Sequence, residues 1–192
     1  MMQSGENRVR LSMYDNRGFN PGASFVKRAL WYMVNAVFFD SYLLTNHAVK
    51  SALLVLFGGS VGKGVVIKPK VKIKYPWNLT VGDNVWIGEG AWIDNLVKVA
   101  IGDDVCVSQG ACVMTGSHDY KKPAFDLIVK PVIIGDGAWI GAKAIVCPGV
   151  TVGSHGVVTA GSVLTTDALP YTVYQGNPAA AKRMREISGA AL

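Results

Sequence analysis

The feature that most constrains this chain is an aliphatic residue that returns every sixth position. Five groups of three such residues occur from residue 61 onward: Val61, Ile67, Ile73, Val81, Ile87, Ile93, Ile101, Val107, Val113, Ile134, Ile140, Val146, Val152, Val158 and Leu164. A period of six does not fit a helix of 3.6 residues per turn or a single hairpin. It fits short strands joined by tight turns, three per coil, with coils stacked about 4.8 Å apart. The sequence therefore predicts an all-β solenoid, a parallel β-helix of about five coils.

Three longer spacings interrupt this rhythm. The spacing is eight positions from Ile73 to Val81, eight from Ile93 to Ile101, and twenty-one from Val113 to Ile134. Each falls between the third strand of one coil and the first strand of the next, so we expect all three additions on one edge of the prism. The longest begins with the polar stretch Gly-Ser-His-Asp-Tyr-Lys-Lys-Pro, 116–123. Loops that leave a rigid repeat stack often carry functional residues, so an inserted catalytic loop is predicted over 114–133.

Segments of different character flank the repeats. Residues 1–57 are expected to form a helical cap with a break near Asp40, and 58–170 the β-helix. Attachment of the cap to a membrane surface, aided by Lys27, Arg28 and Lys50, is the less favoured alternative, because a solenoid end needs a cover. In 171–192, Asn177 and Pro178 suit the start of a helix, so a short basic C-terminal helix is predicted.

Charge and composition limit the kinds of partner that the chain can bind but do not identify one. The 192 residues carry a net charge of +6, which permits anionic partners such as nucleic acid, a membrane surface or a phosphorylated small molecule. Nucleic acid is not expected, because the basic residues are scattered and form no recognition motif. Three cysteines without a CxxC pair fit free thiols in a reducing cytoplasm. With a polar start and no apolar run near the ~20 residues of a membrane span, we expect a cytoplasmic protein, at most peripheral at the inner membrane.

Several motifs occur in an order that resembles one superfamily. They are "GSHDY" (116–120), "IGDGAWIGAKAIVCPGVTVG" (134–153), "TAGSVLT" (159–165) and "GNPA" (176–179). Over roughly 58–185 the chain resembles the left-handed β-helix, or hexapeptide-repeat, acyltransferases. The stretch "NLVKVAIGDDVCVSQGA" (95–111) followed by "TGSHDY" (115–120) is similar to the colanic acid biosynthesis acetyltransferases, relatives of the maltose and galactoside O-acetyltransferases. This resemblance implies a left-handed coil, a homotrimer, and acetyl-CoA bound as co-substrate between neighbouring β-helices.

The resemblance also implies roles for individual residues. His118 stands where the family has its general base, and no metal is required. Trp139, Ala142, Ala160 and Thr165 fall on positions that line the coenzyme A groove. The family commonly has lysine where this chain has Thr166. We therefore expect the phosphate contact to move to cofactor-binding Lys182 or Arg183.

The chemistry of such a transfer can be stated from the residue types alone. A sugar hydroxyl is a poor nucleophile, so transfer from a thioester needs a base at that hydroxyl, and histidine suits this role because its unperturbed pKa lies near neutrality. Of the three histidines, His47 lies in the helical segment and His155 at a coil corner, which leaves His118.

Four acidic or amide residues are candidates for binding the acceptor. Asp119 and Asp126 could orient His118 or the acceptor, or could simply be solvated. Asp94 and Asn95 end a coil on the loop's edge, where they could bond sugar hydroxyls or cap the corner.

The sequence thus favours an O-acetyltransferase that modifies a saccharide during exopolysaccharide or surface-glycan synthesis. Two alternatives stay open, a catalytically silent β-helix scaffold and an N-acyltransferase of the same fold. A zinc carbonic anhydrase of the γ type is disfavoured, because its metal needs three histidine ligands and the three histidines here lie in unrelated settings.

Overall fold

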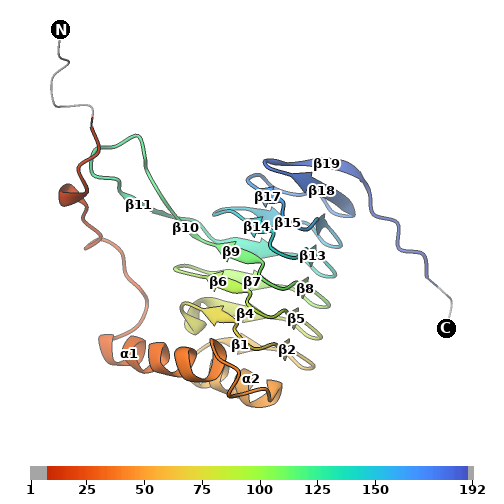
Figure 1. The fold of residues 1–192 in the computed structure, drawn as a ribbon, viewed down its shortest axis with the longest axis horizontal. Helices are drawn as coiled ribbons and strands as arrows, with labels where there is room; N and C mark the ends of the chain where they lie inside the picture. The colour runs from red at the N-terminus through yellow and green to blue at the C-terminus, as the bar shows by residue number, and fades with distance from the viewer. Residues whose placement is uncertain (1–7, 190–192) are drawn as a thin grey trace, which may run out of the picture.

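The computed structural model describes residues 8–189, which wind into a three-sided prism of stacked coils above a helical base (Figure 1). The first sheet stacks β1 (Ser60–Val61), β4 (Leu79–Val81), β7 (Val99–Ile101), β12 (Val132–Ile134) and β15 (Thr151–Val152). The second stacks β2 (Val66–Ile67), β5 (Trp86–Ile87), β8 (Cys106–Val107), β13 (Trp139–Ile140) and β16 (Val157–Val158), and continues into β18 (Thr172–Gly176) and β19 (Ala179–Met184). The third stacks β3 (Lys72–Ile73), β6 (Trp92–Asp94), β9 (Cys112–Met114), β14 (Ile145–Val146) and β17 (Val163–Leu164). The predicted β-helix is confirmed.

The aliphatic residues that recur every six positions form the core of the prism. Fourteen of the fifteen periodic residues are buried, and Val61, in the first strand, is half-buried. Parallel pairing places each of them on the equivalent residue one coil away, as in Ile67 beside Ile87 and Ile87 beside Val107. Their side chains therefore form continuous columns that are removed from water along the whole prism.

One corner shows why glycine precedes aspartate in the repeats. Oδ1 of Asp83, Asp103 and Asp136 accepts a bond from the backbone N–H one coil below, at 2.7, 2.7 and 2.9 Å. A Cβ on Gly62, Gly82 or Gly102 would lie 2.1–2.2 Å from one of these oxygens. A side chain there would displace the carboxylate, so glycine at this position and the ladder of aspartates require each other.

The helical base closes the lower end of the prism. It consists of α1 (Phe25–Val34), a π-helical turn η2 (Asn35–Phe39) and α2 (His47–Leu56), preceded by the short 3-10 turn η1 (Leu11–Met13). Asn35 Oδ1 accepts from the N–H of Ile73 at 3.0 Å and Trp31 Nε1 donates to its carbonyl at 2.9 Å. In the second sheet, His47 Nδ1 bonds the Ile67 carbonyl at 3.0 Å and Lys50 Nζ donates to that of Lys68 at 3.0 Å. The base thus satisfies the open edges of the first coil, as expected of a cap.

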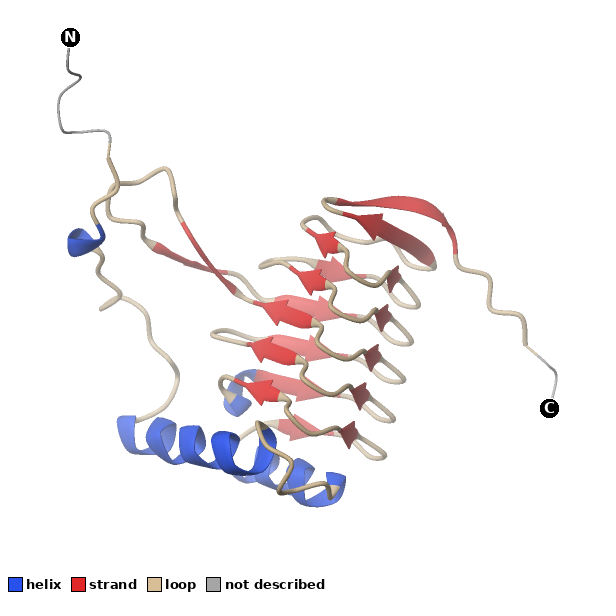
Figure 2. Ribbon diagram, viewed as in Figure 1, coloured by secondary structure: helices blue, strands red, loops and turns tan. Residues whose placement is uncertain are grey.

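The three irregular spacings all lie between the third and first sheets, as predicted. The short 3-10 turn η3 (Pro76–Asn78) occupies the first, and the hairpin of β10 (Gly116–His118) and β11 (Leu127–Val129) occupies the longest. Figure 2 shows this hairpin leaving the prism as a long antiparallel arm, with the N-terminal segment running from its tip down to α1.

The predicted C-terminal helix is wrong. Residues 179–184 form β19, which pairs antiparallel with β18, and Asn177 and Pro178 lie in the turn between them. β18 pairs parallel with β16 on one edge, and without β19 its other edge would be open. Covering that edge outweighs the helix propensity of the alanine-rich stretch. Within residues 8–189, no helix is long and apolar enough to cross a bilayer.

Candidate active site

His118 ends the first strand of the protruding hairpin, where two aromatic rings flank it. Its imidazole stacks on Phe125, with ring centroids 4.4 Å apart and planes 9° from parallel. The ring of Tyr14, from the N-terminal segment, lies on it at 5.6 Å and a tilt of 59°. The N-terminal segment also bonds the hairpin through the Arg10 N–H and the Pro123 carbonyl, at 2.8 Å. Contacts of the arm itself and of the N-terminal segment thus hold the imidazole outside the prism.

The hydrogen bond of His118 determines which ring nitrogen is available for chemistry. Nδ1 lies 2.9 Å from the backbone carbonyl of Phe125. A carbonyl can only accept, so Nδ1 carries the proton in the neutral ring and Nε2 keeps its lone pair. This arrangement suits Nε2 to accept a proton from a bound hydroxyl.

The two acids of the loop bind a lysine rather than the histidine. Lys122 Nζ lies 3.1 Å from Asp126 and 3.8 Å from Asp119. The hydrogen bond that Lys122 donates to Asp126 is the main cause that raises the pKa of Lys122, and the charges of both carboxylates add to it. The Asp119 carboxylate also accepts from the Lys121 N–H at 3.1 Å. The structure therefore brings Asp119 and Asp126 together at the loop tip, without a bond to His118.

Asp94 ends β6 and Asn95 follows it, beneath the arm. Asn95 is fully buried, where Oδ1 accepts from the N–H groups of Lys74 and Tyr75 and Nδ2 donates to the Tyr75 carbonyl. Those bonds hold the corner of the coil. Asp94 is half-buried, and its carboxylate lies 3.8 Å from Lys74 Nζ. Of the two, Asp94 is the one whose side chain reaches solvent.

The residues expected to bind coenzyme A follow a different side of the prism. Trp139 projects outward from β13 and donates from Nε1 to Ser108 Oγ at 2.9 Å. Ala142 and Ala160 stand in successive turns after β13 and β16, where the Ala142 carbonyl accepts from the N–H of Gly161 at 2.8 Å. A groove of about 580 Å³ runs below Trp139 on the second sheet, over Trp86, Cys106 and Ser108. Both apolar residues, such as Val66, and polar ones, such as Gln109, line it.

The remaining expected cofactor contacts are exposed and more distant in the fold. Thr165 follows β17 at the corner from which the lower coils send out their loops, and Lys182 and Arg183 lie on the exposed β19. Figure 1 shows the arm leaving one side of the prism and β13 on the opposite side. One chain therefore brings Trp139, Ala142 and Ala160 together but holds His118 away from them.

Comparison with known proteins places the chain in a family. Residues 131–166 match the family described as hexapeptide repeat of succinyl-transferase. The chain is 38% identical over 169 residues to the Escherichia coli K12 protein named "Putative colanic acid biosynthesis acetyltransferase WcaF", covering 88% of this chain and 92% of that protein. It is 30% identical to the galactoside O-acetyltransferase of the same organism, over 72% and 69% of the two chains. The chain belongs to the hexapeptide-repeat acetyltransferases.

A solved structure agrees with this assignment. The hexapeptide-repeat acetyltransferase VCA0836 of Vibrio cholerae, complexed with acetyl coenzyme A, superposes with a TM-score of 0.78 at 26% identity, over 92% of this chain and 97% of that one. The prism is therefore the left-handed β-helix of this family, and the chain is an acetyltransferase that uses acetyl-CoA as co-substrate.

Two features of the surroundings of His118 escaped the sequence analysis. Phe125 holds His118 through its carbonyl and its ring, and Tyr14 reaches it from more than 100 positions away. Neither belongs to a repeat or to a motif quoted above. A backbone carbonyl has no sequence signal, and Phe125 shares the loop with a second aromatic residue, Tyr120, so its residue type alone does not single it out.

The cysteines of the acetyltransferase lie in the coils rather than in the arm, and Cys112 is on β9, the strand that leads into the arm. Cys112 is half-buried, and burial, with added repulsion from Asp94 and Cys147, raises its pKa to about 11. Burial also raises the pKa of Cys147. Both thiols stay protonated near neutral pH and are poor nucleophiles. Among residues 8–189, no group of three His, Cys, Asp or Glu side chains could hold a metal ion.

Proposed function

We propose that this enzyme transfers the acetyl group of acetyl-CoA to a saccharide hydroxyl, with His118 as general base. The observation that carries the proposal is the bond from His118 Nδ1 to the Phe125 carbonyl, which leaves Nε2 free to accept a proton. The names of the two relatives, one a galactoside O-acetyltransferase and one assigned to colanic acid synthesis, support a saccharide as acceptor. The proposed setting is cytoplasmic assembly of a surface glycan.

The proposed step needs no acyl-enzyme. His118 Nε2 takes the proton of the acceptor hydroxyl as that oxygen attacks the thioester carbonyl, and a tetrahedral intermediate forms. When it collapses, the C–S bond breaks and the acetyl group stays on the acceptor oxygen. The departing CoA thiolate can take the proton back from the imidazolium, which returns the neutral histidine.

A homotrimer is the second part of the proposal. His118 extends from one edge of the prism, while Trp139, Ala142 and Ala160 follow another (Figure 1). A site that contains the base and the coenzyme A groove would then combine the arm of one subunit with the prism of its neighbour. A cyclic arrangement of three identical chains repeats this contact three times and closes.

The test is thiol release from acetyl-CoA over a panel of neutral sugars, amino sugars and glycan precursors. We expect ester formation on a hydroxyl, and a fall of about 10²- to 10⁴-fold for His118→Ala. The matched control is His155→Asn, since His155 has a φ of +58° that asparagine tolerates and lies at a coil corner. Turnover unchanged in His118→Ala would exclude the histidine as base, and an amide product would indicate an N-acyltransferase. Absence of both thiol release and CoA binding would favour a silent scaffold.

Light scattering tests the assembly. We expect three times the mass of one chain, and a single-chain mass together with full activity would contradict a shared site. Mixing His118→Ala subunits with subunits altered at the groove by Ala142→Trp should restore part of the activity if the two halves come from different chains.

Weak attachment to a membrane surface also remains a proposal. The outer face of the cap exposes apolar side chains, among them Phe25, Met33, Leu43 and Leu56. Two of the basic residues once invoked do not face outward, because Lys50 is fully buried and Lys27 lies over the Trp77 ring at 5.1 Å. Flotation with anionic and neutral vesicles checks it, and recovery of the protein in the lipid-free fraction in both cases would contradict it.

A further inference from the structure

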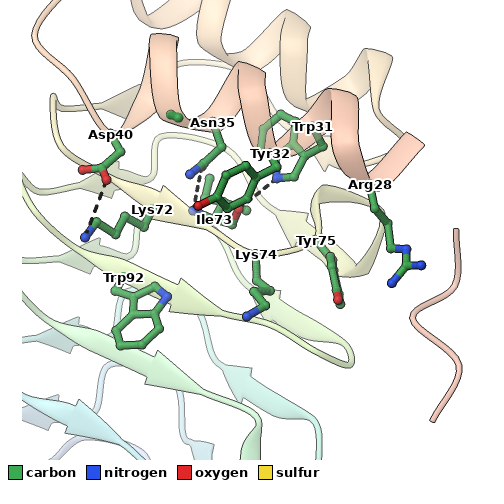
Figure 3. Close-up of a pocket in the computed structure, with 11 residues that line it drawn as sticks. Arg28, Trp31, Tyr32, Asn35, Asp40, Lys72, Ile73, Lys74, Tyr75 and Trp92 are labelled. Atoms are coloured by element: carbon green, nitrogen blue, oxygen red, sulfur yellow. Dashed lines mark hydrogen bonds and ion pairs between the residues drawn. The ribbon is translucent and has the colours of Figure 1, made fainter. Parts of the chain in front are cut away.

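A cavity beneath the arm carries charges that the proposed transfer step does not use. It has a volume of about 410 Å³ and lies between α1 and the outer face of the third sheet, where Trp31, Tyr32, Asn35, Lys72, Tyr75 and Trp92 are among its lining residues. We call it the cap cavity (Figure 3). Its size is that of a site for one small molecule.

The cap cavity is cationic. Arg28, Lys72 and Lys74 line it together with a single carboxylate, Asp40, so three positive charges against one negative leave a net charge of +2. Asp94, behind Lys74, would reduce this to +1 without reversing it. The net charge favours an anionic ligand.

These cations are not strongly committed to protein partners. Lys72 lies 3.6 Å from Asp40 and Lys74 lies 3.8 Å from Asp94, distances longer than a hydrogen bond. Both lysines are about half exposed, and ion pairs of this kind contribute little. No ion pair engages Arg28 within residues 8–189, and its Nε is buried without a hydrogen-bond acceptor. A bound anion would give these donors the acceptor they lack.

Aromatic surfaces complete the cavity. Tyr32 and Trp92 are exposed, and Tyr75 stacks on Trp77 with ring centroids 5.0 Å apart. In the view of Figure 3, Lys74 lies between Trp92 and Tyr75, below Arg28. Flat apolar faces beside cations suit a ligand that combines a sugar ring with an anionic group, since the ring can pack on the aromatic face while the cations bind the charge.

The cavity is linked to the arm that carries His118. The backbone carbonyl of Asp94 accepts from N–H and Oγ1 of Thr115, at 3.1 and 3.0 Å, immediately before β10 begins. Lys74 lies on the first coil and Thr115 follows the third, a rise of two coils or roughly 10 Å. Figure 1 shows β6, β9 and the arm on the same side of the prism, above α1. The base of the arm therefore lies on the same side of the prism as the cavity, two coils above it, and a sugar attached to a phosphate in the cavity would extend toward the arm.

We propose that the cap cavity binds the phosphate or diphosphate group of a phosphate-linked saccharide acceptor. This rests on the proposed function and adds to it the substrate class. The diphosphate could belong to a nucleotide sugar or to a lipid-linked sugar, since both present the same charge and the same glycosyl linkage.

Calorimetric titration of the full-length protein with inorganic pyrophosphate, without acetyl-CoA, tests the cavity directly. We expect Arg28→Gln and Lys74→Gln to weaken binding at least about tenfold each, the scale of one charge-assisted hydrogen bond. Lys63→Gln is the matched control, because Lys63 is an exposed lysine of the first coil outside the cavity. Far-ultraviolet circular dichroism verifies that each variant is folded. Equal affinity in wild type and both cavity variants, or no binding at all, would overturn the proposal.

Kinetics then separates this proposal from the proposed function. Acceptors are compared in three forms: a neutral methyl glycoside, the nucleotide diphosphate sugar, and the same sugar diphosphate on a short prenyl chain. Arg28→Gln should raise KM about tenfold for the diphosphate forms and leave KM for the neutral form unchanged, and the diphosphate form with the lower KM identifies the source. Acetylation of neutral and diphosphate sugars with equal KM would overturn the cap cavity and leave the proposed function standing. Pyrophosphate binding that depends on Arg28, without transfer to any acceptor, would remove the proposed function and keep an anion site.

Discussion

The coils and the arm of this molecule are built on opposite principles. In the coils, each residue packs on its equivalent one coil away, so a side chain such as Ile87 lies between Ile67 and Val107 in one column. In the arm, no residue has an equivalent. His118 is held by Phe125, seven positions later, and by Tyr14 from the N-terminal segment. The coils use the same packing contact in every layer, whereas the contacts of the arm occur only once.

This difference explains where chemistry can reside. A column of identical neighbours is stable because each member is buried by the next, and it therefore presents no reactive group to solvent. An arm outside the columns leaves its histidine half-buried, held by a few contacts. The following experiments separate the stability that the coils provide from the activity proposed for the arm.

The largest effect is expected from removing the arm. The Lys130 N–H donates to the Thr115 carbonyl at 2.9 Å, so the two strands are already paired at its base. Residues 116–129 can therefore be replaced by Asn-Gly, which forms a two-residue hairpin turn. We expect acetyl transfer to fall to background while the melting temperature changes by no more than about 3 °C. Unfolding of the shortened chain at room temperature would show that the arm also stabilises the coils.

The next largest effect contrasts two neighbours on β12. Ile134 is 1% exposed and Ile133 is 49% exposed. Ile134→Ala should reduce the free energy of unfolding by about 2–5 kcal/mol, because it leaves a cavity in a column, whereas Ile133→Ala should cost less than about 1 kcal/mol. Denaturant unfolding at constant protein concentration measures both. An equal loss in the two variants would indicate that a neighbouring subunit covers the first sheet.

The contrast between repeating coils and a non-repeating arm also explains which parts of the structure could be predicted from the sequence. The columns were predicted residue by residue, because burial repeats with the same period as the chain. The cap was predicted because an open solenoid end must be covered. The C-terminal helix was predicted from local propensity, and the prediction failed because the open edge of β18 is a tertiary feature without a sequence signal. His118 was assigned by elimination and resemblance, but its support by Phe125 and Tyr14 depends on how a non-repeating arm folds back on the N-terminal segment.

The reactivity of Cys112 tests whether burial in the coils makes a thiol a poor nucleophile, as expected. The pKa of Cys112 is about 11 against an ordinary value of 9.0, and a raised pKa lowers the thiolate fraction. At pH 8 this fraction should be roughly 100-fold below that of a free cysteine, and reaction with a disulfide reagent should slow accordingly. The measurement uses a Cys106→Ser, Cys147→Ser background so that one thiol reports; this removes the smallest of the three causes, the repulsion from Cys147, and keeps burial and Asp94. Because Asp94 contributes to the shift, Asp94→Asn should accelerate the reaction, and a rate equal to that of the unfolded chain would contradict the shift.

The smallest effect concerns how the arm holds its histidine. The Tyr14 ring covers the imidazole at 5.6 Å, while the Phe125 ring and carbonyl contact it more closely, at 4.4 and 2.9 Å. An aromatic pair contributes about 0.5–1.5 kcal/mol, so Tyr14→Ala should lower kcat by about 2- to 10-fold. The affinity for CoA should not change, because Tyr14 is a positioning residue for His118 and touches none of the expected groove residues.

Tyr14→Phe is the control that separates the ring from its hydroxyl, and it should retain the wild-type kcat. A loss of kcat in Tyr14→Phe would assign the hydroxyl a role that the ring contact does not explain. An unchanged kcat in Tyr14→Ala would mean that the Phe125 carbonyl and ring suffice to hold the imidazole. In that case the arm alone would position His118, and the N-terminal segment would only connect the arm to the cap.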